Sequence, residues 1–314
     1  MEAGISLRKT FATTTLELAD RDPDVVVLVG DISHGLFSEF RQRHPGRYFN
    51  VGILEPAMAS IAAGLSMVGL KPIVHTIAPF LIERSFEQLK LDFSYQGLSG
   101  MFVSVGGAFD YSNLGCTHHS YVDLAMVSSL DDSRVMTPAS LVELASLMRQ
   151  IHENWSGLTY IKLTENGVED YGHNVDVKLG KPMSISATRS PVCVLSVGPS
   201  FVQVAQALEG FDRGTSPSHI HVHTLKPVDY ELLDQMLGNV THVLVVEQAM
   251  SNMGFASTLA VHQSWSRSRT FVPMGLNGFV RNYGTYQELL KESGLDALAI
   301  ETRLRELLSA DGVN

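Results

Sequence analysis

The sequence predicts an α/β protein with two consecutive domains, each built on a parallel sheet. The first observation is length, because 314 residues are too many for one ordinary core and suit two domains. The second is a series of short apolar runs rich in β-branched residues, such as 25-VVVLV. The third is that segments with helical periodicity separate these runs, which is typical of parallel sheets covered by helices on both faces.

The predicted elements alternate along the chain. One helix is expected to begin at Glu55, because Pro56 suits the first turn of a helix, where a missing N–H costs nothing. The strand runs are 25–29, 72–76, 101–105, 158–163, 192–197, 219–225, 242–247 and 270–274, and the helical segments are 6–19, 79–93, 138–155, 199–211 and 252–265.

The domain boundary is predicted from a change of composition. Residues 165–190 are polar, contain Gly and Pro, and show no strong period, as expected of a linker. The first domain is therefore expected to span residues 1–164 and the second residues 191–314.

Composition limits the classes of function. The net charge is −10 and no basic run is present, so no nucleic-acid surface is expected. The longest apolar stretch, 48–70, is interrupted by Glu55 and Pro56 and is predicted to be a buried helix rather than a membrane span. The N-terminal residues carry early acids and lack the apolar core of a signal peptide. Two cysteines, Cys116 and Cys193, fit a reducing cytoplasm, and the 12 scattered histidines predict no metal site in this chain.

Polar and Gly-rich segments follow the strands of the first domain. GDISHG follows 25–29, Glu55 follows 48-YFNVG, IAPF follows 72–76, and GGAFDYSNLGCTHH follows 101–105. Ligands of open α/β sheets bind beyond the carboxyl ends of the strands. We therefore expect one rim to bring together Asp31, Glu55, Phe80, His118 and His119.

Glu55 is the one side chain in 48–70 that can carry a full charge at pH 7. One interpretation is that it only satisfies the N–H groups at the start of its helix, where the dipole favours an anion. Ser, Thr, Asp and Asn cap helices better than Glu, however, and the helix that follows is small and apolar. Burial disfavours the charged form of such a carboxyl unless another group donates to it, and beside a ligand nitrogen it can handle a proton.

Two long stretches carry a resemblance to a known family. FNVGILEPAMASIAAGLSMVGLKPIVHTIAPFLIERSFEQLK and, after it, SVGGAFDYSNLGCTHHSYVDLAMVSSLDDSRVMTPAS resemble the pyrimidine-binding domain of thiamine-diphosphate enzymes, and among these most closely transketolase. HTLKPVDYELL, VLVVEQAMSNMGFAS and NYGTYQELLKESGL resemble the C-terminal domain of transketolase. The resemblance covers nearly the whole chain.

The magnesium motif of the family, GDG followed by a suitable Asn, is absent from the sequence. The resemblance therefore implies the C-terminal subunit of a split transketolase that is inactive alone. An N-terminal partner subunit would supply the Mg²⁺ ligands and the diphosphate-binding domain, and the family arrangement implies an α₂β₂ assembly.

The resemblance also implies roles in binding thiamine diphosphate. Glu55 would face N1′ of the aminopyrimidine, Phe80 would stack on that ring, and Ile77 would line the same pocket. Asp31 would touch the cofactor or the partner interface. From the residues alone, the preferred interpretation of Phe80 is a core residue of the helix at 79–92, and Asp31 could equally be a helix cap.

Other residues are implied to face the sugar substrate. His118 would exchange protons with sugar hydroxyls, and His119 would support it structurally. Arg8 would bind a phosphate of the acceptor, or else be a solvated helix residue. Glu165 stands where the family commonly has a second arginine, and such a carboxylate would repel a phosphate dianion.

Two further departures from the family pattern bear on the substrate. Gly106 and Gly107 stand where a histidine is common, and Asn113 and Leu114 replace an acidic pair. We therefore expect transfer of a two-carbon ketol unit from a ketose donor to an aldehyde acceptor that is an atypical sugar, either unphosphorylated or nucleotide-linked.

Three alternatives stay open at this point. The β subunit of a 2-oxo-acid dehydrogenase is a separate chain of this size, but it lacks THH at this spacing. A deoxyxylulose-phosphate-synthase-like carboligase has a similar loop, but is normally one long chain. A regulatory or scaffold subunit is the alternative that is not an enzyme.

Overall fold

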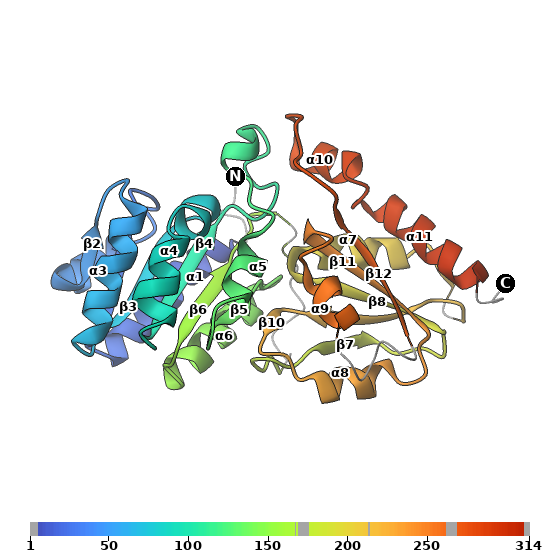
Figure 1. Cartoon of the computed structure of the whole chain (residues 1–314), viewed down its shortest axis with the longest axis horizontal. Coiled ribbons are helices and arrows are strands. Elements are labelled where there is room, and N and C mark those ends of the chain that lie inside the picture. The colour runs from blue at the N-terminus through green and yellow to red at the C-terminus, as the bar shows by residue number, and fades with distance from the viewer. Residues whose placement is uncertain (1–5, 167, 169–175, 213, 262–268, 311–314) are drawn as a thin grey trace.

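A computed structural model describes residues 6–166, 168, 176–212, 214–261 and 269–310. The chain forms two sheets that lie side by side, each flanked by helices (Figure 1). This architecture confirms the predicted α/β fold with two mostly parallel sheets. No helix in the described part of the chain is long and apolar enough to cross a membrane.

The first sheet has seven strands in the order β10-β5-β6-β4-β3-β1-β2. All pairs are parallel except β10 with β5, which is antiparallel. Its regular elements from residue 7 to 162 are α1 (Leu7–Arg21), β1 (Val25–Val29), α2 (Ser38–Arg43), β2 (Tyr48–Asn50), α3 (Glu55–Met67), β3 (Lys71–Ile77), α4 (Phe86–Gln88), β4 (Gly100–Val105), α5 (Asp123–Ser128), β5 (Arg134–Met136), α6 (Leu141–Glu153) and β6 (Leu158–Lys162).

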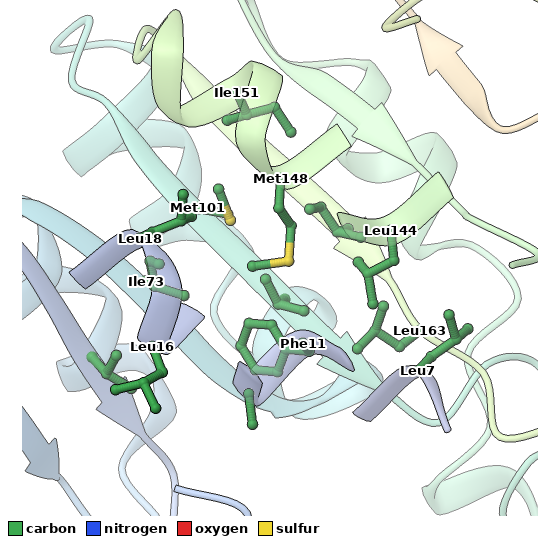
Figure 2. Packing of buried hydrophobic residues seen from close by; sticks show 14 of the residues in the cluster. Leu7, Phe11, Leu16, Leu18, Ile73, Met101, Leu144, Met148, Ile151 and Leu163 are labelled. Carbon is green, nitrogen blue, oxygen red and sulfur yellow. The ribbon is translucent and has the colours of Figure 1, made fainter. Parts of the chain in front are cut away.

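Both faces of the first sheet are buried, which explains the uninterrupted apolar run of β1. Val27 points into a core formed with α1 and α6, and Leu28 points into the opposite core beneath α3. Figure 2 shows Phe11 of α1 and Met148 of α6 meeting in the first of these cores. Each side chain of this size contributes about 1.5–3 kcal/mol when it is fully buried.

The second sheet has the strand order β12-β11-β8-β9-β7, with β7 antiparallel to β9. It is built in the same way, since Val194 of β8 faces one core and Leu195 faces the other. Its elements, with the edge strand β10, are β7 (Met183–Ser186), β8 (Val192–Val197), α7 (Phe201–Leu208), β9 (Ser218–Val222), β10 (Thr224–Lys226), α8 (Tyr230–Leu237), β11 (His242–Met250), α9 (Phe255–Val261), β12 (Thr270–Leu276), α10 (Tyr286–Glu292) and α11 (Ala297–Ala310).

Two observations refine the predicted domain boundary. Strand β7 lies inside the range 165–190 that was expected to be a linker, and it belongs to the second sheet. The run 219–225 was expected to be one strand, but it divides into β9 in the second sheet and β10 in the first. The second half of the chain therefore supplies an edge strand to the first sheet.

The segment 79–93 is not a continuous α-helix. It contains two π-helical segments, Pro79–Glu83 and Leu89–Ser94, separated by the short helix α4. The N–H of Arg84 donates to the carbonyl oxygen of Pro79, five residues back, at 3.0 Å. One extra residue in a turn rotates the side chains that follow by about 100° relative to an α-helix, and such turns often occur at functional sites.

Candidate active site

Glu55 is buried at the start of α3, where it forms an ion pair. Its side chain is 2% exposed, and Nη1 of Arg84 donates to its Oε2 at 2.8 Å. Glu55 therefore has a donor from outside its own helix, so the interpretation that it only satisfies helix N–H groups does not describe its contacts. Among the residues that the structure describes, no group donates a hydrogen bond to the other carboxyl oxygen, Oε1.

Arg84 also connects Glu55 to Phe80. The guanidinium carbon of Arg84 lies 4.3 Å from the centroid of the half-buried Phe80 ring, which is a cation–π contact. A buried carboxyl and an aromatic ring are thus joined through one planar cation. A planar ligand that carries ring nitrogens could stack on Phe80 and share a proton with Glu55.

His118 lies on the loop between β4 and α5, beside the same aromatic ring. Its imidazole makes edge contacts with Phe80, at 5.2 Å between ring centroids, and with Tyr111, at 5.7 Å. The hydroxyl of Thr117 lies 2.9 Å from Nδ1. Burial lowers the pKa of His118 below its usual value, so the imidazole is mostly neutral at pH 7 and can accept a proton.

His119 is buried in the interior of the same loop. Its Nε2 donates to the backbone oxygen of Tyr111 at 3.1 Å, and its Nδ1 accepts from the hydroxyl of Tyr121 at 2.7 Å. Burial lowers the pKa of His119, so the ring is neutral and this pattern fixes its tautomer. Both ring nitrogens are used within the loop.

Tyr111 fills the space beyond the end of β4. A Cβ atom on Gly106 would lie 2.6 Å from the Tyr111 ring and 3.4 Å from Cγ2 of Ile77, and Gly106 has φ = +85°. A larger residue at position 106 would collide with Tyr111 and would strain the backbone. A histidine, which the family pattern commonly has near this point, therefore has no room at Gly106. Ile77, at the end of β3, lines the same corner.

A second group of polar residues lies where α1 begins and where β1 and β6 end. Arg8 donates to Glu165 at 2.6 Å and to the hydroxyl of Ser33 at 3.0 Å. Ser33 lies 2.9 Å from Nε2 of His75, whose Nδ1 donates to the oxygen of Val103. Burial lowers the pKa of His75 to about 4, so His75 is neutral and accepts from Ser33.

Asp110 ties this second group to the loop that carries His118. Its carboxyl accepts from the hydroxyl of Thr164 at 2.8 Å, from the N–H of Gly107 at 2.8 Å and from the N–H of Glu165 at 3.0 Å. Burial raises the pKa of Asp110 despite these donors. Asp110 therefore fixes the backbone at Glu165 through the N–H of that residue.

Asp31 lies after β1 in a left-handed backbone conformation, with φ = +55°. Its exposed carboxyl accepts from Asn50 at 3.1 Å and lies 3.0 Å from Nε2 of His34. The hydrogen bond from Asn50 and the neighbouring His34 lower its pKa. Helix α2 begins only at Ser38, and Asp31 does not cap it, so the alternative interpretation as a helix cap is wrong.

Three residues of this region were not singled out from the sequence: Arg84, Asp110 and Tyr111. Arg84 is the residue that brings Glu55 and Phe80 together, and a charged residue four positions after Phe80 was a signal within the sequence. Among the residues described, no group of three or more His, Cys, Asp or Glu side chains could hold a metal ion.

Comparisons with known families match both halves of the chain. The family described as "Transketolase, pyrimidine binding domain" matches residues 3–168, and "Transketolase, C-terminal domain" matches residues 183–300.

Proteins of similar length are among the relatives. The chain is 30% identical to an uncharacterised 33.6 kDa protein of the fasciation locus of Rhodococcoides fascians, over 95% of this chain and 93% of that protein. It is 26% identical to an apulose-4-phosphate transketolase subunit of Phocaeicola vulgatus, over 93% of this chain and 94% of that subunit. A solved split-gene transketolase, described as an inactive tetramer of beta chains, superposes with a TM-score of 0.87 at 26% identity, covering 98% of this chain and 99% of that chain.

Longer relatives match only in part. The 1-deoxy-D-xylulose-5-phosphate synthase of Chlorobium luteolum is 27% identical over 95% of this chain. The chain spans about half the length of that synthase, 48%.

Proposed function

Because this chain belongs to the transketolase family, with the pyrimidine-binding and C-terminal domains of that family, we propose that it is the C-terminal subunit of a split transketolase-like enzyme. The reaction is the transfer of a two-carbon ketol unit from a ketose to an aldehyde acceptor, dependent on thiamine diphosphate. The observation that carries this proposal is the cluster of Glu55, Arg84 and Phe80, since it offers a buried carboxyl beside an aromatic ring.

The residues present fit the aminopyrimidine of thiamine diphosphate. Oε1 of Glu55 has no donor among the described residues and suits a protonated ring nitrogen. Phe80 offers a flat apolar surface, and Ile77 borders the same corner as Tyr111. When bound, this cofactor supplies a nucleophilic carbon and an electron sink for breaking and making carbon–carbon bonds.

The chain's own residues orient the cofactor and move protons. Glu55 holds a proton against the ring nitrogen, and the surrounding apolar helix keeps water away from it. Phe80 fixes the plane of the ring. His118 takes a proton from a substrate hydroxyl and later returns it, which its neutral state at pH 7 allows. Asp31 lies further along the same rim and is assigned to the cofactor edge or the partner interface.

An exposed apolar surface next to Glu55 favours the proposal that a partner chain binds there. Ile61 within α3, and Leu54 and Val68 directly before and after this helix, are exposed by 46, 60 and 75%. Apolar patches of this kind mark interaction sites. We call this surface the α3 face; it consists of the exposed apolar residues of α3 and of the residues next to its two ends, Ile53, Leu54, Ile61, Met67 and Val68.

We assign the α3 face to the N-terminal subunit that carries the diphosphate-binding domain and the Mg²⁺ ligands. Glu55 lies directly after Ile53 and Leu54, so a chain bound to the α3 face closes over the carboxyl. The relative from Phocaeicola vulgatus is named as one subunit of a transketolase, which fits a chain that works with a second one. The isolated chain is therefore inactive, and an α₂β₂ assembly is the arrangement we propose.

The ion pair between Arg8 and Glu165 favours an acceptor without a terminal phosphate near this point. Arg8 is the cation that a phosphate would need, and Glu165 already occupies it at 2.6 Å. The pair presents both a donor and an acceptor edge, which suits sugar hydroxyls. We propose an unphosphorylated or nucleotide-linked sugar as the acceptor.

The test is reconstitution with the partner. The chain is co-expressed with a neighbouring gene product that carries GDG…N, supplied with thiamine diphosphate and Mg²⁺, and assayed by mass spectrometry over ketoses, 2-oxo acids and aldehydes. Products two carbons longer than the acceptor, without CO₂, support ketol transfer. Release of CO₂ instead assigns the chain to a decarboxylating relative such as the synthase or the dehydrogenase subunit.

The choice of acceptor is tested with the same complex. Steady-state rates are compared for xylulose 5-phosphate with ribose 5-phosphate and for unphosphorylated or nucleotide-linked aldoses. Efficient turnover of the two sugar phosphates would contradict the role assigned to Glu165. Normal partner binding with no reaction on any substrate would favour a regulatory subunit.

A further inference from the structure

The loop that carries His118, residues 106–122, belongs to the first domain but is anchored in the second. Phe109 and Tyr121 are buried in the apolar core of the second domain, where Phe109 lies 6.3 Å from the Tyr286 ring, centroid to centroid. The N–H of Met250, at the end of β11, donates to the oxygen of Tyr121 at 3.1 Å. The two ends of the loop are therefore fixed by the second domain.

The middle of the loop is held by a different contact. A Cβ atom on Gly115 would lie 2.7 Å from Cε1 of Tyr283 and 3.0 Å from its Cζ, so the tyrosine ring lies directly against the backbone of Gly115. Gly115 has φ = +70°, and its oxygen accepts from the N–H groups of His118 at 3.0 Å and His119 at 3.2 Å. The peptide covered by Tyr283 is thus the one that closes the turn presenting His118.

We propose that Tyr283, on the loop between β12 and α10, is a positioning residue that holds His118 in place for the sugar substrate. The neighbouring side chains do little to pack this turn against the protein, because Leu114, Cys116 and Thr117 are all exposed. Tyr283 acts through Gly115, and the C-terminal domain thereby contributes to the substrate site. The kinetic consequence rests on the proposed function, whereas the structural consequence does not.

Removal of the ring lets the turn relax away from Phe80 and Tyr111, which His118 contacts edge-on. A displacement of about 1 Å at a catalytic group can lower a rate by about 100-fold. We therefore expect Tyr283→Ala to lower kcat/KM for the sugar by about 10- to 100-fold. Affinity for thiamine diphosphate is unchanged, because Glu55 and Phe80 do not lie on this loop.

The first experiment needs no activity and uses the full chain alone. The His118 imidazole is titrated by NMR in the wild type and in Tyr283→Ala, Tyr283→Phe and Phe279→Ala. Phe279 is the matched control, because it is an exposed aromatic residue, 63% accessible, on the same loop. The titratable neighbours of His118 are Tyr111 and His119.

In the wild type, His118 titrates below its ordinary value, because it is partly buried. Tyr283→Ala exposes the ring and moves the midpoint of the titration upward, whereas Tyr283→Phe and Phe279→Ala leave it in place. An unchanged midpoint in Tyr283→Ala overturns the proposal. A shift of equal size in Phe279→Ala also overturns it, because the effect would then belong to the loop in general.

The second experiment uses the complex with the partner. In the wild-type background, Tyr283→Ala lowers kcat/KM, and in a His118→Ala background it causes a further loss of less than about twofold, because both changes act on one group. A full additional loss in the His118→Ala background overturns the proposal. If the wild-type complex transfers no carbon unit, the proposed function fails, and the titration still decides the role of Tyr283.

Discussion

The Arg84→Met substitution isolates the contact on which the candidate site depends. Methionine keeps a long apolar side chain near Phe80 but removes the group that donates to Oε2 of Glu55. A carboxyl that is 2% exposed then loses its charged partner. We expect the substitution to lower the free energy of unfolding.

The size of this effect follows from the exposure of the two partners. Breaking a fully buried ion pair costs about 3–5 kcal/mol, because one charge is left without compensation. The Arg84 side chain is 44% exposed, so water screens the pair and can partly replace the lost donor. We therefore expect a loss of about 1–3 kcal/mol for Arg84→Met. When Glu55 is first changed to Gln, the cost of Arg84→Met falls by at least about 1 kcal/mol, because no buried charge remains.

The assay is urea-induced unfolding of the full chain, without cofactor, at pH 8. The four proteins of the cycle are the wild type, Arg84→Met, Glu55→Gln and the double variant, with their m-values compared. Arg41→Met is the control, since Arg41 also lies over an aromatic ring, that of Tyr48, at 5.7 Å. The control should lose less than about 0.5 kcal/mol. A coupling energy between Arg84 and Glu55 below about 0.3 kcal/mol would refute the reasoning.

Three further predictions test other parts of the chain. Burial raises the pKa of Glu247 to about 7, so the folded chain binds more protons than the unfolded chain between about pH 4.5 and 7. The free energy of unfolding therefore falls as the pH rises through this range, by up to about 3 kcal/mol. Urea unfolding at pH 5 and pH 8 should show that Glu247→Gln removes this fall, and an equal fall in both proteins would argue against it. Glu165→Gln removes the negative charge that pairs with Arg8 and should lower KM for phosphorylated acceptors several-fold in steady-state assays, without a matching change for neutral sugars; an unchanged ratio speaks against the ion pair as a specificity element. Ile61→Asp places a charge on the α3 face and should weaken binding of the partner chain at least about tenfold by calorimetry, while unchanged binding would place the interface elsewhere.

The regular parts of the first sheet could be predicted because they follow local pattern. The run VVVLV is buried on both faces, and the helix at Glu55 begins where Pro56 indicated. Strand β10 could not be predicted in the same way. Its residues follow β9 after a single residue, and their pairing with β5 in the first sheet is a tertiary contact that local sequence does not encode.

The sequence predicted which segments reach the edge of the sheet where the candidate site lies, but not the side-chain contacts within that site. The segments after β1, β3 and β4 do lie at the carboxyl ends of parallel strands, which topology requires. The ion pair of Arg84 with Glu55 joins residues that are 29 positions apart on different elements, so local spacing does not place Arg84 beside Glu55. The contact of Tyr283 with Gly115 joins residues that are far apart in sequence and in different domains, and no local pattern encodes it.

The pairing of Arg8 with Glu165 changes how the departure at position 165 is understood. From the sequence, Glu165 was expected to repel a phosphate by its charge. In the structure it also occupies the guanidinium that would bind one, and Asp110 fixes the backbone beneath it. Repulsion and occupation act in the same direction, against a phosphorylated acceptor.

The most direct test of the account is the turnover of Glu55→Gln in the reconstituted complex, at saturating thiamine diphosphate and with partner binding verified. Glutamine keeps the shape of the side chain and can still accept from Arg84, but it cannot hold a shared proton as a carboxyl does. We predict a rate at least about 100-fold below that of the wild type. A rate within about threefold of the wild type, with the partner bound, would show that Glu55 is not the proton-handling residue of this site.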